Sequence, residues 1–497
     1  MSEVHANNAL ILYGRWEKPR TTGLYGMTWG VTVFAGILVI LNIGVFWFTR
    51  SLPATGILLA ASALLVGPMV ITIGGRTGWE LMILRTQFQW SKWRGETLFR
   101  GGAFGAVPGI GRMPGIAGDT RLYEYELRNG ERFGLVHLKA KNHFAVSFSI
   151  QSRGQERVDQ HQINDWVLGW GDFLAQLGSS RGAVGACVVV ESVPDNRTRI
   201  SAEVKRITHP SAPAYAKQVM AETAMHSSSA VVRSEVRLTL TFGRLREAAG
   251  KEVADQAAEI GRRMSTLMAA AARAGLEATP MTPGEWCVAP TRAYNPQLTE
   301  DLEAIAGTGS EDQLHWEAAG PVTAVNKWDH WVHNGYRSIT WEMATAPAGQ
   351  VPAHVLRPLL IPRADVRRKR IAIIYRVHNT AEAVKLVDSD YREALAAEQS
   401  KKGVVSAAAT VRVENTNAAR REQATGAGLT RFGMLVTATV APDEDLPSIR
   451  AEIEGMADGA HIGLRRCYGY QDAAFAGALG IGIILPEYAS TSSKVSA

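Results

Sequence analysis

Two long apolar runs near the N-terminus dominate the hydrophobic pattern of the chain. The first, Thr28–Phe48, reads TWGVTVFAGILVILNIGVFWF and holds no charged residue. The second, Ala54–Ile73, follows the short break Arg50–Pro53 and is also uncharged. A helix of about 20 apolar residues spans the hydrocarbon core of a bilayer. The pattern therefore predicts a transmembrane helical hairpin with a very short loop over residues 26–75.

The charges that flank the two runs predict their orientation. Three basic residues lie shortly before the first run and five follow the second, whereas the loop holds only Arg50. Because basic residues accumulate on the cytoplasmic side, we expect an inner-membrane protein with the N-terminal segment 1–25, both termini and the whole soluble region in the cytoplasm. Aromatic and basic side chains gather at bilayer interfaces, and those expected here are Trp29, Trp47, Arg50, Arg76, Trp79, Trp90 and Trp93.

Residues 76–118 are expected to form a juxtamembrane segment and a linker. Thr77–Phe99 mixes tryptophan, arginine and apolar residues with poor helical periodicity. Two interpretations stay open for it, a helix along the inner membrane surface and a linker helix packed on the soluble region. Gly101–Gly118 holds seven glycines and two prolines, which is typical of a linker. It lacks the Gly-Lys-Ser/Thr of a phosphate-binding loop.

After Gly118 the chain alternates short β-branched runs with helical patterns, which predicts a mixed α/β (α+β) fold. A β-hairpin is expected around Asn129-Gly130, a strong turn signal. A long alanine-rich helix is expected over Lys251–Ala274, and the run KRIAIIYRV, Lys369–Val377, is typical of a buried strand. The soluble region is therefore expected to be a cytoplasmic mixed α/β platform.

A similar order of elements returns in the second half of this region. It includes a helix expected over Ala353–Leu360 and a last short strand expected over Ile481–Leu485. The two passes suggest duplicated β-α-β units with ferredoxin-like halves. They divide the platform into α/β units at residues 119–290 and 291–497.

The net charge of the chain and its basic clusters raise the question of whether it contacts nucleic acid. The chain has 497 residues and a formal net charge of +6, which is compatible with contact to anionic lipid or DNA but demands neither. Basic clusters lie at Arg363, at Arg367–Arg370 and at Arg420–Arg421. A solvated turn, a protein interface and a DNA contact are alternative interpretations of them.

The sequence offers no catalytic motif. It contains no HExxH, GxSxG or Walker A pattern. Its three cysteines, Cys187, Cys287 and Cys467, are far apart and form no CxxC pair, so neither a disulfide framework nor a cysteine zinc site is expected. His330 and His333 could share a helix face as metal ligands, but no third ligand stands at motif spacing. We therefore expect no enzyme, no cofactor and no metal.

Two regions resemble known families. The head Gly14–Gly30, GRWEKPRTTGLYGMTWG, followed at once by the hairpin, resembles the PrgI-type membrane subunits of actinobacterial conjugative elements. The tail Gly463–Glu487, GLRRCYGYQDAAFAGALGIGIILPE, resembles the end of an actinobacterial two-span membrane protein family found beside a VirB-type conjugation ATPase. The whole chain is similar to that family in length and layout. Its soluble part resembles the N-terminal, non-ATPase domain of VirB-type secretion ATPases.

The resemblance implies an integral membrane structural component of a type IV-like conjugative DNA-transfer machine, which anchors or docks a separate VirB-type ATPase. Membrane lipid, that ATPase and other secretion subunits are the expected partners, and a homo-oligomer within a complex is the expected assembly. An EccE-like component of a type VII secretion system, which also places two membrane helices before a cytoplasmic α/β domain, is the alternative. Tyrosine and arginine are enriched at interface hot spots, so a partner interface or packing on the last strand is expected for Arg465, Arg466, Tyr468 and Tyr470.

Overall fold

The computed structural model describes residues 11–14, 29–73, 76–105, 111–152, 158–194, 204, 207–226, 232–245, 252–306, 308–347, 349–399 and 407–488. The chain divides into two compact units, each treated by itself below. One unit is Trp16–Glu96, and the other joins Met1–Arg15 to Thr97–Ala497. The unit that contains Thr97–Ala497 is called the body here.

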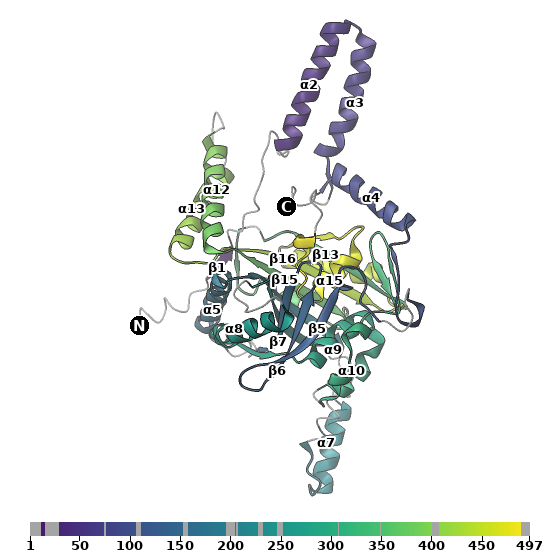
Figure 1. The fold of residues 1–497 in the computed structure, drawn as a ribbon, viewed down its shortest axis with the longest axis vertical. Helices are drawn as coiled ribbons and strands as arrows, with labels where there is room; N and C mark the ends of the chain where they lie inside the picture. The colour runs from purple at the N-terminus through teal and green to yellow at the C-terminus, as the bar shows by residue number, and fades with distance from the viewer. Residues whose placement is uncertain are drawn as a thin grey trace. The chain divides into compact units, whose positions relative to one another are not determined.

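The smaller unit contains the expected apolar hairpin, which is confirmed (Figure 1). Its helices are α2 (Trp29–Thr49) and α3 (Leu52–Val70), and both are long and apolar enough to cross a membrane. Arg50 takes a positive φ of 47° in the loop. Ser51 caps α3 by accepting a hydrogen bond from the Ala54 amide at 3.5 Å.

A polar contact joins the two apolar helices. The Asn42 amide donates to the Ser62 hydroxyl of the other helix at 2.9 Å and to the Leu38 carbonyl of its own helix at 2.8 Å. Hydrogen bonds between helices in an apolar environment stabilise their association by about 0.6–2 kcal/mol. Asn42 therefore helps to fix the register of the hairpin, a role that the hydropathy pattern does not reveal.

A third helix, α4 (Gly78–Trp93), follows the hairpin within the same unit after the short strands β2 (Thr72–Ile73) and β3 (Arg76–Thr77). Its start is a capping box. The Thr77 hydroxyl accepts from the Glu80 amide at 3.2 Å, and the Glu80 carboxylate accepts from the Thr77 amide at 3.1 Å. The segment Thr77–Phe99 is thus helical over most of its length.

Thirteen strands of the described residues form one sheet in the body, and each neighbouring pair is antiparallel. Along the sheet they are β4 (Leu98–Arg100), β11 (Thr323–Asn326), β12 (Trp331–His333), β13 (Tyr336–Thr345), β16 (Thr430–Val440), β15 (Lys369–Val377), β8 (Ala183–Pro194), β9 (Val232–Phe242), β7 (His143–Ser152), β6 (Arg132–Leu138) and β5 (Thr120–Glu126). β10 (Leu276–Pro280) pairs with β7, and β17 (Gly463–Arg466) pairs with β13. A separate pair joins β1 (Leu12–Gly14) to β14 (Gln350–Pro352).

Two groups of four strands in this sheet share one spatial order. β7, β8, β9 and β10 lie in the order β10-β7-β9-β8, and β13, β15, β16 and β17 lie in the order β17-β13-β16-β15. In each group the order is fourth, first, third, second. The second strands of the two groups, β8 and β15, pair with each other and make the sheet continuous.

Helical segments are inserted at the same place in both groups, between the second and third strands. The first group carries α7 (Ala214–His226) there. The second group carries α12 (Thr380–Gln399) and α13 (Ala407–Ala424), which lie side by side as a helical hairpin (Figure 1).

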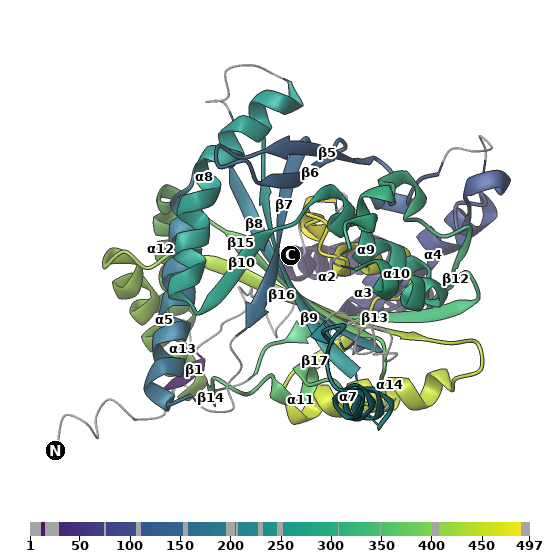
Figure 2. The same ribbon diagram turned by 90° about the horizontal axis from the view of Figure 1, so that it is seen from below.

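On one face of the sheet, each strand group is covered by its own pair of helices. α5 (Gln160–Ser179) and α8 (Val253–Arg273) pack together over the first group (Figure 2). Alternate strand residues such as Phe148, Leu238 and Leu240 point into this core. α14 (Leu446–Gly459) and the short α11 (Arg357–Leu360) cover the second group in the same way.

The opposite face is covered by α9 (Pro283–Tyr294), α15 (Gln471–Ala478) and the chain that follows α15. Two strand hydroxyls hold that chain, since Thr239 donates to the Gly480 carbonyl at 2.6 Å and Thr241 donates to the Gly482 carbonyl at 3.2 Å. We call residues 471–484 the tail segment. Shorter helices are α10 (Thr299–Ile305), α16 (Leu485–Tyr488) and 3₁₀ turns at Gly102–Phe104, Gly115–Ala117, Pro296–Leu298, Ser310–Gln313 and Trp316–Ala318.

The mixed α/β class and the hairpin at Asn129-Gly130 are confirmed, whereas two predicted elements are wrong. The helix expected over Ala353–Leu360 is limited to α11, because β14 ends at Pro352 and the chain then turns. The strand expected over Ile481–Leu485 is absent from the described residues. The chain turns there at two positive-φ glycines, and its apolar side chains pack on the sheet face instead. The division at 290/291 stays a prediction.

We predict that Gly480→Ala destabilises the body through both conformation and packing. Gly480 has a φ of 70°, and an added Cβ would lie 2.4 Å from Cγ2 of Val189. A left-handed alanine costs about 1–2 kcal/mol, and overpacking a core costs about 1–3 kcal/mol more. Chemical denaturation of the full chain in detergent, monitored by tryptophan fluorescence, measures the decrease in the free energy of unfolding. The control is Gly309→Ala, where φ is 78° but no described atom lies within 4 Å. Equal losses in the two variants would contradict the packing argument.

Candidate functional site

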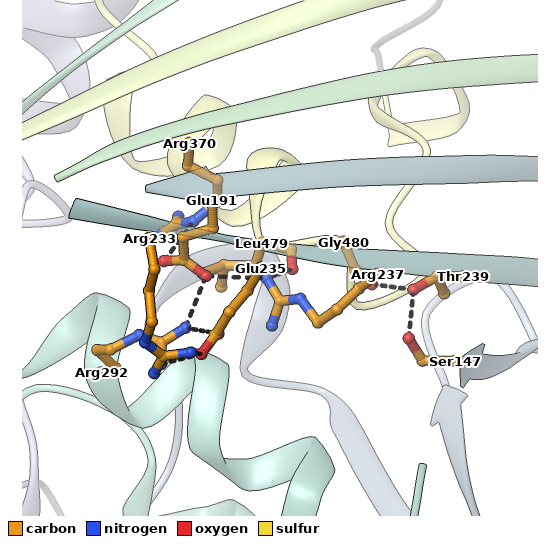
Figure 3. Close-up of polar contacts among 10 residues, drawn as sticks. All are labelled: Ser147, Glu191, Arg233, Glu235, Arg237, Thr239, Arg292, Arg370, Leu479 and Gly480. Carbon is orange, nitrogen blue, oxygen red and sulfur yellow. Dashed lines mark hydrogen bonds and ion pairs between the residues drawn. The ribbon is translucent and has the colours of Figure 1, made fainter. Parts of the chain in front are cut away.

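A cluster of buried charges lies where the two strand groups meet (Figure 3). At its centre is Glu191 on β8, whose cross-strand neighbour on β15 is Arg370. The Arg370 Nε donates to one carboxylate oxygen of Glu191 at 3.3 Å. Arg237 on β9 donates to the other oxygen at 3.2 Å. Three adjacent strands thus meet at one carboxylate.

Arg292 reaches the same carboxylate from α9 and donates to it at 3.1 Å. It also contacts both carboxylate oxygens of Glu235, which lies directly opposite Glu191 in the β8–β9 register. Like charges opposite each other in a sheet repel, so one guanidinium between two carboxylates removes this repulsion. The helix is fixed at its start by a capping box of Thr282 and Glu285.

The edge of the cluster adds a fourth arginine and a third glutamate. Arg233 on β9 pairs with Glu235 at 2.5 Å and with Glu303 of α10 at 3.2 Å. The cluster therefore holds four arginines, at 233, 237, 292 and 370, and three glutamates, at 191, 235 and 303, so its formal charge is +1.

The cluster also holds the tail segment. The Arg237 Nη2 donates to the Leu479 carbonyl at 3.5 Å. This contact lies next to the hydrogen bond from the Thr239 hydroxyl to the Gly480 carbonyl (Figure 3). The Arg370 guanidinium lies over the Phe475 ring with its carbon 5.0 Å from the centroid. Such a cation–π contact contributes about 0.5–2 kcal/mol, more when desolvated. The charges thus connect both strand groups, α9 and the tail.

Burial and charge act in opposite directions on these groups. Burial raises the pKa of the Glu191 carboxyl, but Arg292, Arg370 and Arg237 outweigh it and lower the pKa to about 2. Burial lowers the pKa of Arg292, yet Glu235 and Glu191 raise it above its usual value. For Arg237 burial prevails, and its pKa is lowered despite Glu191.

The arrangement suits a structural clamp rather than proton transfer. A carboxylate with a pKa near 2 is a weak general base at neutral pH. The cavity beside it, which Arg292, Arg370 and Thr439 help to line, measures about 20 Å³. That volume holds about one water molecule, whereas ligand pockets measure about 300–1,000 Å³. Among the described residues no group of three or more His, Cys, Asp or Glu could hold a metal ion.

Of the four predicted interface residues, Arg465 and Arg466 end β17 and Tyr468 and Tyr470 follow it, and each is half-buried. Arg465 and Tyr470 both donate to the Glu342 carboxylate at 2.8 Å. Arg466 lies over the Tyr468 ring at 4.9 Å and 3.9 Å from Glu454. Packing within the chain is therefore part of their role, and a partner interface stays a prediction.

The predicted membrane-interface residues lie at the ends of the hairpin and on α4. Trp29 is the first residue of α2, and Trp47 lies in its last turn. Arg50 is in the loop and Arg76 is in β3. The remaining three, Trp79, Trp90 and Trp93, lie on α4.

The histidine pair is not on a helix, because residues 331–333 form β12. His330 contacts Asp329 at 2.9 Å, whereas His333 is fully buried between the Tyr294 carbonyl and the Ser338 hydroxyl. Burial lowers the pKa of His333 to about 4, so this ring is neutral at pH 7.

The basic cluster that precedes and begins β15 is only partly on the surface. Lys369 and Arg370 are buried, and Arg363 pairs with Asp365 at 2.6 Å and with Glu452 at 2.7 Å. These residues therefore form a weaker candidate for a DNA-binding surface than their spacing in the sequence indicates, and DNA contact stays a prediction.

Reasoning from sequence missed the charge cluster. One signal was present, since Glu191 interrupts the apolar strand run GACVVVESV, whereas Arg237 stands at a regular polar position of an alternating strand. Buried charges are almost always paired, so Glu191 pointed to a partner. The sequence did not show that α9 and the tail would supply Arg292 and the backbone carbonyls.

Comparison with known proteins covers only the region around the hairpin. Residues 20–80 match the model of a domain of unknown function, DUF8461. The match includes both apolar helices and the start of α4, and it leaves out the charge cluster. No curated protein matches the chain.

We predict that Glu191→Gln strongly destabilises the body. The variant leaves three buried guanidinium groups without their shared charge, and breaking a buried ion pair costs about 3–5 kcal/mol. Denaturation of the full chain in detergent measures the change. The matched control is Glu124→Gln, which removes an exposed pair with Arg132 at 3.0 Å and is expected to cost about 0–1 kcal/mol.

The same variant gives a pH signature. The folded pKa of Glu191 is about 2 against an ordinary 4.5, so its charge stabilises the fold at pH values above 4.5. This stabilisation is lost as pH falls from 4.5 toward 2, because the unfolded chain takes up the proton first. The gap in unfolding free energy between the native protein and Glu191→Gln should shrink over that window. A gap that stays constant down to pH 2 would contradict this assignment.

Proposed function

We propose that this chain is an integral membrane subunit of a type IV-like conjugative DNA-transfer machine, where it anchors or docks a separate ATPase at the inner membrane. The observation that carries the proposal is the hairpin of α2 and α3. Its apolar side chains are exposed along both helices, among them Ile40, Trp47 and Leu64. Exposure of this apolar surface to water is unfavourable, whereas the hydrocarbon core of a bilayer accommodates it.

The proposed orientation places the body in the cytoplasm. Basic residues follow the hairpin at Arg76, Arg85 and Lys92, while its loop carries Arg50 alone. The positive-inside rule then puts the loop outside and both termini inside. The PrgI-like head before the hairpin agrees with a subunit of a conjugative element.

We further propose that the body consists of two duplicated ferredoxin-like units. The support is the order fourth-first-third-second, which recurs in both strand groups. The helical insertions between the second and third strands add to it. A rigid platform of this kind agrees with the resemblance of the soluble part to the non-ATPase domain of VirB-type ATPases, and its role here is to present docking surfaces.

The docking surface that we propose for the ATPase is the patch of Arg465, Arg466, Tyr468 and Tyr470. Internal contacts hold it in place, since the Glu342 carboxylate fixes two of these side chains and Trp328 stacks on Tyr468 with centroids 5.6 Å apart. Side chains that are ordered before binding lose little entropy on association.

We predict that a cysteine in the loop faces the outside. A membrane-impermeant maleimide added to intact spheroplasts should label Arg50→Cys. It should label Val384→Cys, on α12, only after permeabilisation. The background is low because all three native cysteines are buried. Labelling of position 384 in intact spheroplasts would overturn the proposed orientation.

We predict that cross-linking in native membranes recovers a VirB-type ATPase with this chain. Arg466→Glu should reduce the recovery about tenfold if this arginine is an interface hot spot. Arg121→Glu makes the same charge change at an exposed position away from the patch and should leave the recovery unchanged. Recovery of type VII pore components instead would favour the EccE-like alternative.

A further inference from the structure

One face of α4 is apolar and exposed. At 100° per residue, Trp79, Met82, Ile83, Trp90 and Trp93 fall within one side of the helix. Trp90 and Trp93 are 59% and 79% exposed, with ring centroids 5.5 Å apart. Large apolar patches on a surface mark a binding partner or a membrane, so this face requires an occupant.

A shallow hollow of about 400 Å³ lies on the flank of this face. Its lining combines one cationic group, two uncharged polar side chains and two indole rings, namely Arg85, Thr86, Gln89, Trp90 and Trp93. A guanidinium binds phosphate oxygens in a bidentate manner, and indole rings prefer the level of lipid headgroups. This combination matches the headgroup region of a phospholipid.

The start of α4 is fixed to the end of the hairpin. The Gly78 amide donates to the Ile71 carbonyl at 2.8 Å. A Cβ at Gly78 would lie 2.9 Å from the Pro68 carbonyl oxygen, so the backbones of α3 and α4 meet closely there. If α3 spans the bilayer, α4 begins at the level where its hydrocarbon core ends.

We propose that α4 lies in the interface of the same leaflet and that its Arg85–Trp93 hollow binds the headgroup of an anionic phospholipid. The proposal rests on the membrane anchor proposed above. Continuity with the hairpin and the positive charge of Arg85 select lipid as the occupant. Lys92, one turn from Gln89 on the same helix, adds attraction for an anionic surface.

The test uses the full chain in nanodiscs of phosphatidylcholine and phosphatidylglycerol, with quenchers on the lipid acyl chains. A fluorescent label is attached to Met82→Cys, to Leu64→Cys on α3 or to Val384→Cys on α12. These native side chains are 45%, 78% and 41% exposed, and the native cysteines are buried. We expect quenching at positions 64 and 82 and none at position 384.

The three labels separate the two proposals. Quenching at 64 without quenching at 82 would overturn the lipid contact of α4 and assign its face to a protein, while the anchor stands. Absence of quenching at 64 would overturn the anchor itself.

The headgroup site has its own variant. For this test only phosphatidylglycerol carries the quencher, and the label is on Met82→Cys. Arg85→Gln should reduce the enrichment of phosphatidylglycerol around this label about fivefold, because one basic residue near an anionic surface contributes about 1 kcal/mol. Arg50→Gln removes the same charge from the loop at the other end of the hairpin and should leave the enrichment unchanged. An unchanged enrichment in Arg85→Gln would overturn the headgroup site.

Discussion

The carboxylate of Glu191 connects parts of the chain that are far apart in sequence. It receives guanidinium groups from β9, α9 and β15, and the partners on β9 and β15, Arg237 and Arg370, are separated by more than a hundred residues. A charge of this kind is tolerated in a protein interior only when it is fully paired. The pairing of β8 with β15 and the position of α9 are therefore tied to one another, because moving any of them would leave a bare charge in a dry environment.

Much of the architecture followed from patterns that are local in the sequence. The two apolar runs indicated the hairpin, Asn129-Gly130 indicated the first β-turn, and KRIAIIYRV indicated a central strand. These features depend on residues within one element, so one stretch of chain contains the information. The strand predicted over Ile481–Leu485 was wrong for the same reason, because this apolar run resembles a strand when it is considered without the rest of the chain. Gly480 and Gly482 break the extended conformation there, and the sheet supplies hydroxyls to bind their carbonyls.

The candidate site was harder to predict because its members come from separate elements. The sequence placed Arg370 in a basic cluster at the start of a buried strand, and only the sheet register shows that it faces Glu191. Asn42 and the aromatic face of α4 are intermediate cases. Both features can be located in the sequence. Their roles become clear only when the helix that Asn42 contacts and the exposed side of α4 are known.

The contact between Thr239 and Gly480 spans 241 residues and has a consequence for biogenesis. The hairpin that we propose as the membrane anchor leaves the ribosome before the body and can enter the membrane while the body is still being synthesised. The face of the sheet that receives residues 479–484 stays open until that segment has been synthesised. With the proposed anchor, the nascent body is held at the membrane surface with an incomplete core until the tail segment emerges. A ribosome that stops before residue 479 would then leave an anchored product whose open sheet face is a ready substrate for membrane-bound proteases.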